Sequence, residues 1–156
     1  MMWPITLMTV DIRKEFRRLH GMELTSCRLI GNLIENDPPE AMRARLKEHL
    51  RDTQWQVKLV KSCAELLGET GKESLQLPMQ DLWGTCSGFG ALLAYKKFEI
   101  SNYQSALVVA RKTGICEIAD ICQELLDCEK SFSSWLQKQV FKNAWIPTAS
   151  PKYLAV

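Results

Sequence analysis

The sequence has no apolar run that approaches the about 18 residues needed to cross a bilayer. We therefore expect no membrane association. Its apolar start, residues 1–10, has no basic n-region and is interrupted early by Pro4, so it does not have the pattern of a signal peptide. We expect a cytoplasmic protein in which residues 1–8 form an N-terminal arm or a lead-in to the first helix.

The motifs of the common hydrolases and phosphotransferases are also missing. The chain has only two histidines, and it contains neither a nucleophile elbow nor a glycine-rich phosphate loop. A cysteine–histidine catalytic pair would need only residues that are present, but no local signature of one occurs. The sequence alone therefore leaves open whether the chain is an enzyme.

The charge balance contains little to attract a polyanion. The formal net charge is +2, so no overall field favours nucleic acid, and we expect no nucleic-acid partner. One local basic cluster lies near the start, where a solvated helix face is the first interpretation and phosphate binding the alternative. The cluster consists of Arg13, Lys14, Arg17 and Arg18.

The six cysteines include no C-x-x-C pair. Cys116, Cys122 and Cys128 are spaced by six, which is about 240° of helical rotation per step. They cannot all line one helix face, so a metal site made of these three thiolates is not expected. A chain of 156 residues with 46% hydrophobic residues has enough core to fold without disulfides. Free thiols are the expectation.

Helical periodicity dominates the sequence, and no segment alternates like a strand. The pattern predicts an all-α, ferritin-like four-helix bundle over residues 9–141, followed by an irregular tail over residues 142–156. Prolines 38 and 39 separate the first two helices, and Gly114 separates the last two. The four predicted helices are residues 9–34, 39–67, 81–113 and 116–141.

The lengths of the connections predict the topology. Short links near residues 35–38 and 113–115 make each pair of helices an antiparallel hairpin. The polar link over residues 69–80 could reach nearly 40 Å at roughly 3.3 Å per residue, about the length of a 26-residue helix. This permits an up-down-down-up order, with a crossover between the second and third helices.

Each predicted helix carries one acidic residue where a core residue is expected. Glu23, for example, lies between Leu19 and Ile30 on one apolar stripe. An isolated buried carboxylate is costly unless a proton or a cation neutralises it, and hard ions such as iron or manganese do so in helical bundles. The alternative is that each acid lies at the edge of its stripe and reaches solvent. The acids are Glu23, Asp52, Glu99 and Glu129.

Two further polar residues share the stripe of Asp52. His49, Asp52 and Gln56 lie on one helix face at positions i, i+3 and i+7. His49 and Gln56 are therefore candidate accessory ligands. His49 has two other interpretations, a partner of a carboxylate or a hydrogen-bonded core histidine.

Four stretches resemble the YciE/YciF family of bacterial ferritin-like proteins, more closely its YciE branch. They are H-G-M-E-L from His20, R-A-R-L-K-E-H-L-R-D-T-Q-W-Q-V from Arg43, F-E-I-S-N-Y from Phe98, and L-L-D-C-E-K-S-F-S-S-W-L from Leu125. The resemblance implies a closed four-helix bundle that self-associates, here expected as a homodimer, with a link to stress response. It also implies a site for two iron or manganese ions. The family's ligand positions fall on Glu23, Asp52, Glu99 and Glu129.

The chain departs from the family at that site. Ferritin-like iron centres commonly use Glu-x-x-His, but Trp55 follows Asp52 at this spacing and Phe132 follows Glu129. Lys96 stands where the family often has a further acid, and a buried pair with Glu99 would replace a metal ion by an internal cation. Two functions follow. One is a ferritin-like stress protein with a degenerate two-ion site, and the other is a metal-free bundle acting as a structural or protein-interaction module.

Overall fold

The helical periodicity of the sequence corresponds to four helices in the computed structural model. The structure describes the backbone of residues 3–68 and 88–143, and the side chains of residues 12–68 and 88–142. Within these ranges the chain forms helices and no strand, which confirms the predicted all-α class. The helices are α1 (Trp3–Glu35), α2 (Glu40–Leu66), α4 (Phe89–Thr113) and α5 (Cys116–Asn143).

The first helix begins earlier than predicted. Residues 3–8 belong to α1, so of the two predicted alternatives this stretch is a lead-in to the helix and not a separate arm. Pro4 lies in the first turn, where its missing N–H costs no helical hydrogen bond. The α1 helix ends at Glu35, before the two prolines.

The turn between α1 and α2 is built from residues that cannot continue a helix. Asp37 has a φ of 56°, in the left-handed region that aspartate tolerates better than most residues. Its carboxylate forms an ion pair with Arg43. The Pro39 carbonyl accepts hydrogen bonds from the backbone N–H groups of Met42 and Arg43, each at 2.9 Å. The α2 helix therefore starts directly after Pro39, within one residue of the predicted start.

The boundaries of the last two helices also have local causes. Gly114 adopts a φ of 74° and ends α4, and its N–H donates to the Arg111 carbonyl at 3.2 Å. The predicted start of the third helix, residues 81–87, lies outside the described residues. The α5 helix continues to Asn143, so the predicted tail loses its first two residues to the helix, and residues 144–156 lie outside the described part.

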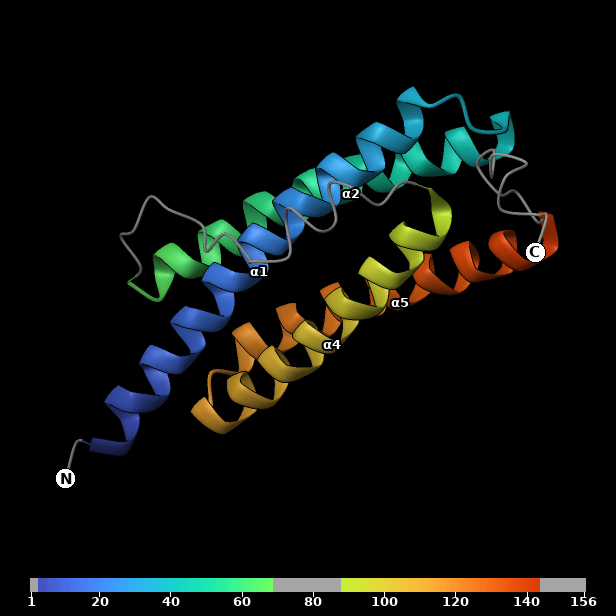
Figure 1. The fold of residues 1–156 in the computed structure, drawn as a ribbon. Coiled ribbons are helices and arrows are strands. Elements are labelled where there is room, and N and C mark those ends of the chain that lie inside the picture. The colour runs from blue at the N-terminus through green and yellow to red at the C-terminus, as the bar shows by residue number, and fades with distance from the viewer. Residues whose placement is uncertain (1–2, 69–87, 144–156) are drawn as a thin grey trace, which may run out of the picture.

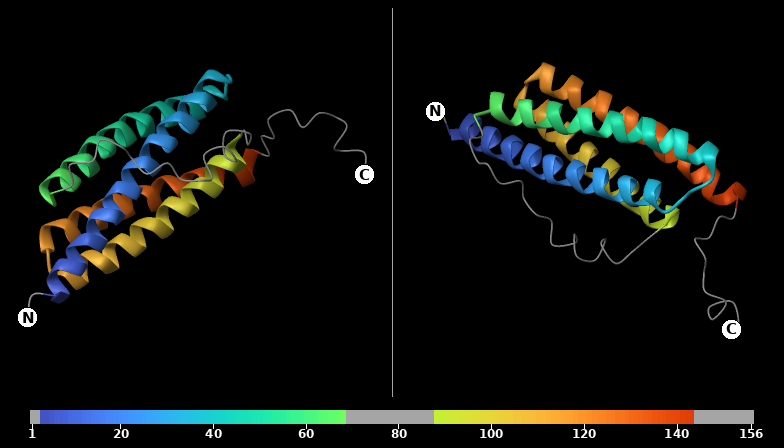
Figure 2. Two further views of the ribbon diagram at one scale, coloured as in Figure 1. Left: turned by 60° about the vertical axis from the view of Figure 1, so that its left-hand side comes forward. Right: turned by 90° about the horizontal axis from the view of Figure 1, so that it is seen from above.

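Two helix pairs form the bundle (Figure 1). The α1 helix packs against both α2 and α4, and α4 packs against α5, whereas α2 and α5 touch much less. Figures 1 and 2 show α2 and α4 running in the same direction. The connection between them, residues 69–87, lies outside the described residues, so its crossover path stays a prediction.

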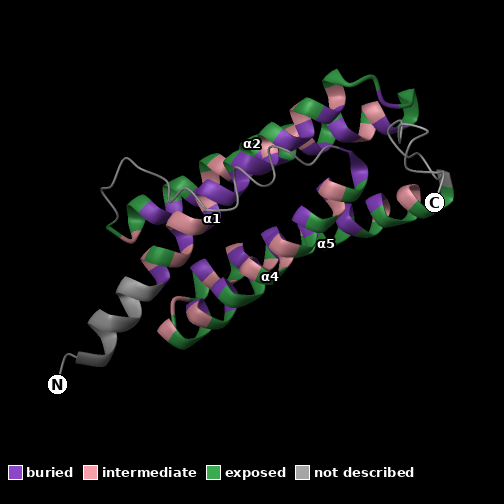
Figure 3. Ribbon diagram, in the orientation of Figure 1, coloured by how far each residue is buried: buried purple, intermediate pink, exposed green. Residues whose placement is uncertain are grey.

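The core occupies the space enclosed by the four helices, where the buried faces meet (Figure 3). Aromatic side chains supply much of its volume, each contributing on the order of 2 kcal/mol by leaving water. No helix in the described residues has an apolar stretch long enough to span a bilayer. Large, fully buried core side chains include Ile12, Phe16, Leu19, Tyr95, Tyr103 and Phe132.

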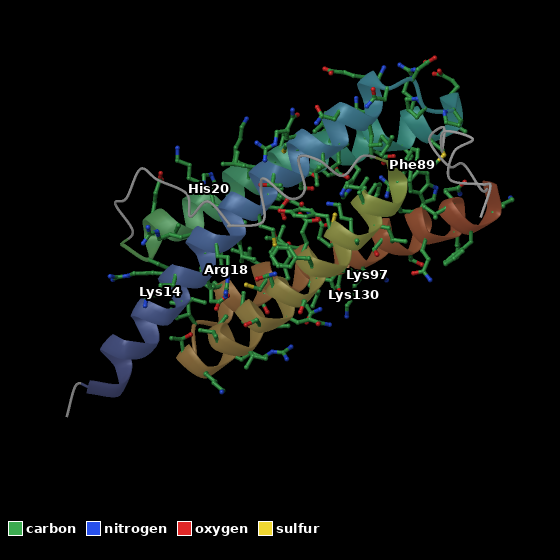
Figure 4. All side chains as sticks on the ribbon, viewed as in Figure 1. Lys14, Arg18, His20, Phe89, Lys97 and Lys130 are labelled. Atoms are coloured by element: carbon green, nitrogen blue, oxygen red, sulfur yellow. The ribbon has the colours of Figure 1, made fainter. Side chains whose placement is uncertain are left out.

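The basic cluster near the start of the chain is partly structural. The Arg13 guanidinium donates a hydrogen bond to the Leu67 carbonyl and so ties α1 to the C-terminal end of α2. Arg18 forms an ion pair with Glu15 on its own helix. Figure 4 shows Lys14 and Arg18 along α1.

Candidate functional site

Three of the four predicted acids meet in the middle of the bundle. Glu23 comes from α1, Glu99 from α4 and Glu129 from α5, and all three side chains are fully buried. One carboxylate oxygen of each lies within 4.8 Å of the others. The apolar stripes that predicted these positions therefore converge, and we call these three residues with Lys96 the carboxylate–lysine cluster.

Lys96 supplies the positive charge of this cluster. Its Nζ lies 2.7 Å from Glu99 Oε2 and donates hydrogen bonds to Glu129 Oε2 at 2.9 Å and Ser26 Oγ at 2.8 Å. The side chain is fully buried, and its Nζ also lies 5.5 Å from the Phe132 ring centroid. The predicted pairing of Lys96 with Glu99 is confirmed, and the ammonium reaches groups on three helices.

Lysines next to the buried cluster residues in sequence are exposed, in contrast to Lys96. Lys97 follows Lys96, and Lys130 follows Glu129, yet both are exposed on α4 and α5 (Figure 4). A shift of one position is about 100° of helical rotation. The position of Lys96 on the helix therefore turns its side chain into the core, while its neighbours point outward.

Tyr103 completes the polar interior. Its hydroxyl donates a hydrogen bond to Glu23 Oε1, while Glu23 Oε2 has no hydrogen-bond partner among the described residues. Burial, followed by the charge of Glu23, raises the pKa of the Tyr103 phenol, so it stays a donor. Ser26 follows Glu23 by three residues and Tyr103 follows Glu99 by four, but neither was predicted to be part of the site. Their distance of one turn from an inward glutamate is the signal that could have placed them there.

Protons are part of the charge balance. Burial, and then repulsion from Glu129, raises the pKa of Glu23 to about 8 and that of Glu99 well above its ordinary value. Burial lowers the pKa of Lys96, but the three carboxylates raise it by more, so the net direction is upward. With Lys96 charged and two carboxyls protonated, the cluster is electrically neutral.

Asp52, the fourth predicted acid, does not join the cluster. Its side chain is exposed, so the expectation that each helix turns one acid inward is wrong for α2. Thr53 takes the buried position, and its hydroxyl donates to the His49 carbonyl at 2.8 Å. Asp52 instead lies with His49 and Cys128, whose candidate ligand atoms are also within 4.8 Å of one another.

His49 is the contribution of α2 to the interior. It is fully buried, its Nε2 lies 3.9 Å from Glu129 Oε2, and its ring stacks on Phe132 at 3.5 Å between centroids. Burial, then the charges of Lys96 and Arg45, lowers its pKa, so the imidazole is neutral. Neither ring nitrogen has a hydrogen-bond partner among the described residues. Gln56 is buried nearby, and its Oε1 has no partner there either.

A pair of iron or manganese ions does not fit the carboxylate–lysine cluster. The donor atoms would suit hard ions, but the Lys96 ammonium already contacts two of the three carboxylates. A divalent ion bound to the same oxygens would lie roughly 4 Å from that ammonium. The repulsion is about 8 kcal/mol at an effective dielectric constant of about 20. The cluster is neutralised by an internal cation and protons.

Comparison with known proteins supports the helical fold and part of the resemblance seen in the sequence. A family model described as "Domain of unknown function (DUF892)" matches residues 84–144, which is less than half of the chain. It describes the YciF-like ferritin-like proteins. The chain is thus similar to that family over its second helix pair, while the closer likeness to YciE stays a prediction. No curated protein matches the chain.

Solved structures match over most of the chain. A protein from Xanthomonas campestris pv. campestris superimposes with a TM-score of 0.75 at 22% identity, covering 88% of this chain and 93% of its own. YcfI from Rhodopseudomonas palustris gives a TM-score of 0.70 at 19% identity, covering 88% of this chain and 97% of its own. At such identities the likeness shows the shared helical-bundle fold.

Proposed function

We propose that this protein is a ferritin-like helical bundle in which the Lys96 ammonium replaces the metal pair of the carboxylate core. Its role is then structural, or that of an interaction module, and not iron or manganese oxidation. The observation that carries the proposal is the contact of one buried ammonium with Glu99, Glu129 and Ser26. The link to stress response comes from the resemblance to YciE/YciF.

The ligand pattern supports the same conclusion. The histidines of Glu-x-x-His pairs are replaced by Trp55 and Phe132, and Asp52 is exposed. The positions that would complete a two-ion site therefore lack donors that point inward. The similar protein YcfI is described as a candidate structural protein, which agrees with a structural role.

The second candidate function is residual binding of iron or manganese. The three clustered carboxylates favour it, because an ion can bind there by displacing their protons. The two functions differ in what happens when metal is offered to the intact chain.

Metal reconstitution separates the two functions. Untagged protein is incubated with excess iron(II) without oxygen, or with manganese(II), then desalted and analysed for bound metal. We expect substoichiometric iron and manganese in the native chain and in the Glu99→Gln variant alike, because Lys96 holds the site. Two ions per native chain, lost in Glu99→Gln and retained in the surface variant Glu48→Gln, would establish the metal-binding function instead.

A further inference from the structure

A second group of ligand-type side chains lies between α2 and α5. His49 and Asp52 are one turn apart on α2, and Cys128 comes from α5. One candidate ligand atom of each lies within 4.8 Å of the other two. Donors around a tetrahedral ion are roughly 3.3–3.8 Å apart, given metal–ligand bonds of about 2.0–2.3 Å. The 4.8 Å limit exceeds this range by about 1 Å, so the three donors lie close to the spacing that one ion requires.

The group borders the carboxylate–lysine cluster at Glu129 but shares no ligand with it. It contains none of the three clustered glutamates and includes an exposed acid, so it opens toward solvent. It also lies between α2 and α5, the neighbouring helices that contact each other least. An ion held there would join two helices that otherwise share little packing.

An unpartnered buried imidazole is the second, independent observation. His49 is fully buried, yet both of its ring nitrogens lack hydrogen-bond partners among the described residues. Leaving such groups unpaired in a protein interior is costly, and coordination would satisfy one of them. Burial keeps this imidazole neutral by lowering its pKa, and the neutral ring is the form that binds metals.

The surroundings of His49 also resemble those of metal-bound histidines. Such a histidine usually directs its other ring nitrogen at a carboxylate, and His49 Nε2 faces Glu129 Oε2 at 3.9 Å. With Nε2 directed at Glu129, Nδ1 is the nitrogen left for an ion. The buried Gln56 Oε1, which has no partner in the described part of the chain, lies one turn beyond Asp52 on the same face.

The chemistry of the donors selects the ion. One imidazole nitrogen, one carboxylate and one thiolate form a mixed set that suits zinc, whereas iron(II) and manganese(II) in ferritin-like cores prefer oxygen-rich sites. We propose that His49, Asp52 and Cys128 bind one zinc ion, with the fourth position left to water. A zinc ion with one carboxylate and one thiolate is neutral overall. The Cys128 thiol proton is released to solvent on binding.

Cobalt(II) replaces zinc as a spectroscopic probe and reports on the sulfur ligand directly. Titrating the full chain with cobalt(II) should give one ion per chain and a thiolate-to-cobalt charge-transfer band, which added zinc removes. Cys128→Ser should abolish the band, and Asp52→Asn should weaken zinc binding by calorimetry at least about tenfold. The matched controls are Cys27→Ser, another half-buried cysteine, and Asp120→Asn, an exposed acid on α5. Both should bind as the native chain does.

Several outcomes would overturn the proposal. These are the absence of a charge-transfer band in the native chain, native zinc affinity in Cys128→Ser, and an equal loss in Cys27→Ser. Zinc binding that is lost in Glu99→Gln but kept in Cys128→Ser would place the ion in the carboxylate–lysine cluster, and this would also contradict the zinc site. Far-ultraviolet circular dichroism of each variant verifies that the helices are intact, and the nearly isosteric changes keep the comparison valid.

Discussion

Lys96 contacts groups on three helices with one ammonium: Ser26 on α1, Glu99 on its own helix and Glu129 on α5. Buried ion pairs are weak evidence for stability in themselves, because desolvation of the charges opposes their attraction. Removing one partner is different, since it leaves an uncompensated charge in a low-dielectric interior. The buried acids therefore need the Lys96 ammonium if the fold is to be stable.

Replacing Lys96 by methionine should therefore destabilise the fold strongly. The side chain keeps its approximate length but loses the charge, so the one carboxylate that stays charged in the cluster loses its cation. We expect the free energy of unfolding to fall by about 3–5 kcal/mol, measured by urea denaturation at neutral pH. The exposed neighbour provides the control, because Lys97→Met should change stability by less than about 0.5 kcal/mol. Equal effects of the two substitutions would contradict the assignment.

The raised pKa of Glu23 predicts a pH dependence of stability. Between the ordinary value of 4.5 and about 8, the unfolded chain has lost the Glu23 proton while the folded chain keeps it. The free energy of unfolding should therefore fall as pH rises through this window, by about 1.4 kcal/mol per pH unit for each such group, and then level off. Glu99, whose pKa is raised in the same direction, adds to the slope.

Glu23→Gln isolates the first of these contributions. The amide stays neutral and accepts the Tyr103 hydrogen bond, so the slope between pH 5 and pH 8 should be clearly smaller than in the native chain. Glu48→Gln, at a mostly exposed position, should leave the slope unchanged. Stability that rises with pH in the native chain over this interval would show that the buried carboxyls do not keep their protons.

Single residues differ in how far the sequence predicts them. Glu23, Glu99 and Glu129 were predictable because apolar neighbours on their stripes determine which way they face. The pair of Lys96 with Glu99 was predictable because both lie on one helix, one turn apart. The contact between Lys96 and Glu129 was not, because it depends on how α4 and α5 rotate against each other.

At the scale of the helices, two glycines with different backbone conformations allow a matched pair of substitutions. Gly114 ends α4 with a φ of 74°, whereas Gly31 lies inside α1, and a Cβ added at either meets nothing within 4 Å. Gly114→Ala should destabilise by about 1–2 kcal/mol because of the left-handed backbone. Gly31→Ala should stabilise by about 0.5–1 kcal/mol because alanine is the better helix former.

Thermal denaturation of the two variants in parallel tests this account of the helix boundaries. Opposite shifts of the melting temperature are the expected result. A downward shift for Gly31→Ala, or none for Gly114→Ala, would contradict it.

Some helix boundaries and buried positions follow from the sequence, and others do not. Prolines 38 and 39 and Gly114 determine three of the boundaries, and the structure has them where the sequence predicts. On α2, Asp52 and Thr53 are adjacent and both lie near the edge of the apolar stripe, so the stripe could not separate them, and packing buried the threonine. The start of α1 was left open because a proline in the first turn of a helix looks the same in sequence as a proline that breaks one.

At the scale of the whole molecule, the resemblance predicts self-association. The homodimer implied by the resemblance needs an apolar surface, and α2 carries two exposed apolar side chains, Trp55 (59% exposed) and Leu66 (84% exposed). Their spacing of 11 residues places them on one helix face. Trp55→Ser should therefore weaken dimerisation, measured by sedimentation at micromolar concentration, while Val108→Ser on α4 should not. A monomeric native chain would remove the basis of this prediction.

The protonation state of Lys96 tests the central claim most directly. In a nitrogen-15-labelled protein, the Lys96 Nζ should give an ammonium signal with slowed proton exchange, because the group is buried and hydrogen-bonded, and Lys96→Met identifies it by its loss. The account predicts that this signal persists at neutral pH and beyond the ordinary lysine pKa of 10.5, unchanged by added iron(II) or manganese(II). A neutral Lys96 amine at pH 7, or displacement of the signal by either metal, would contradict it.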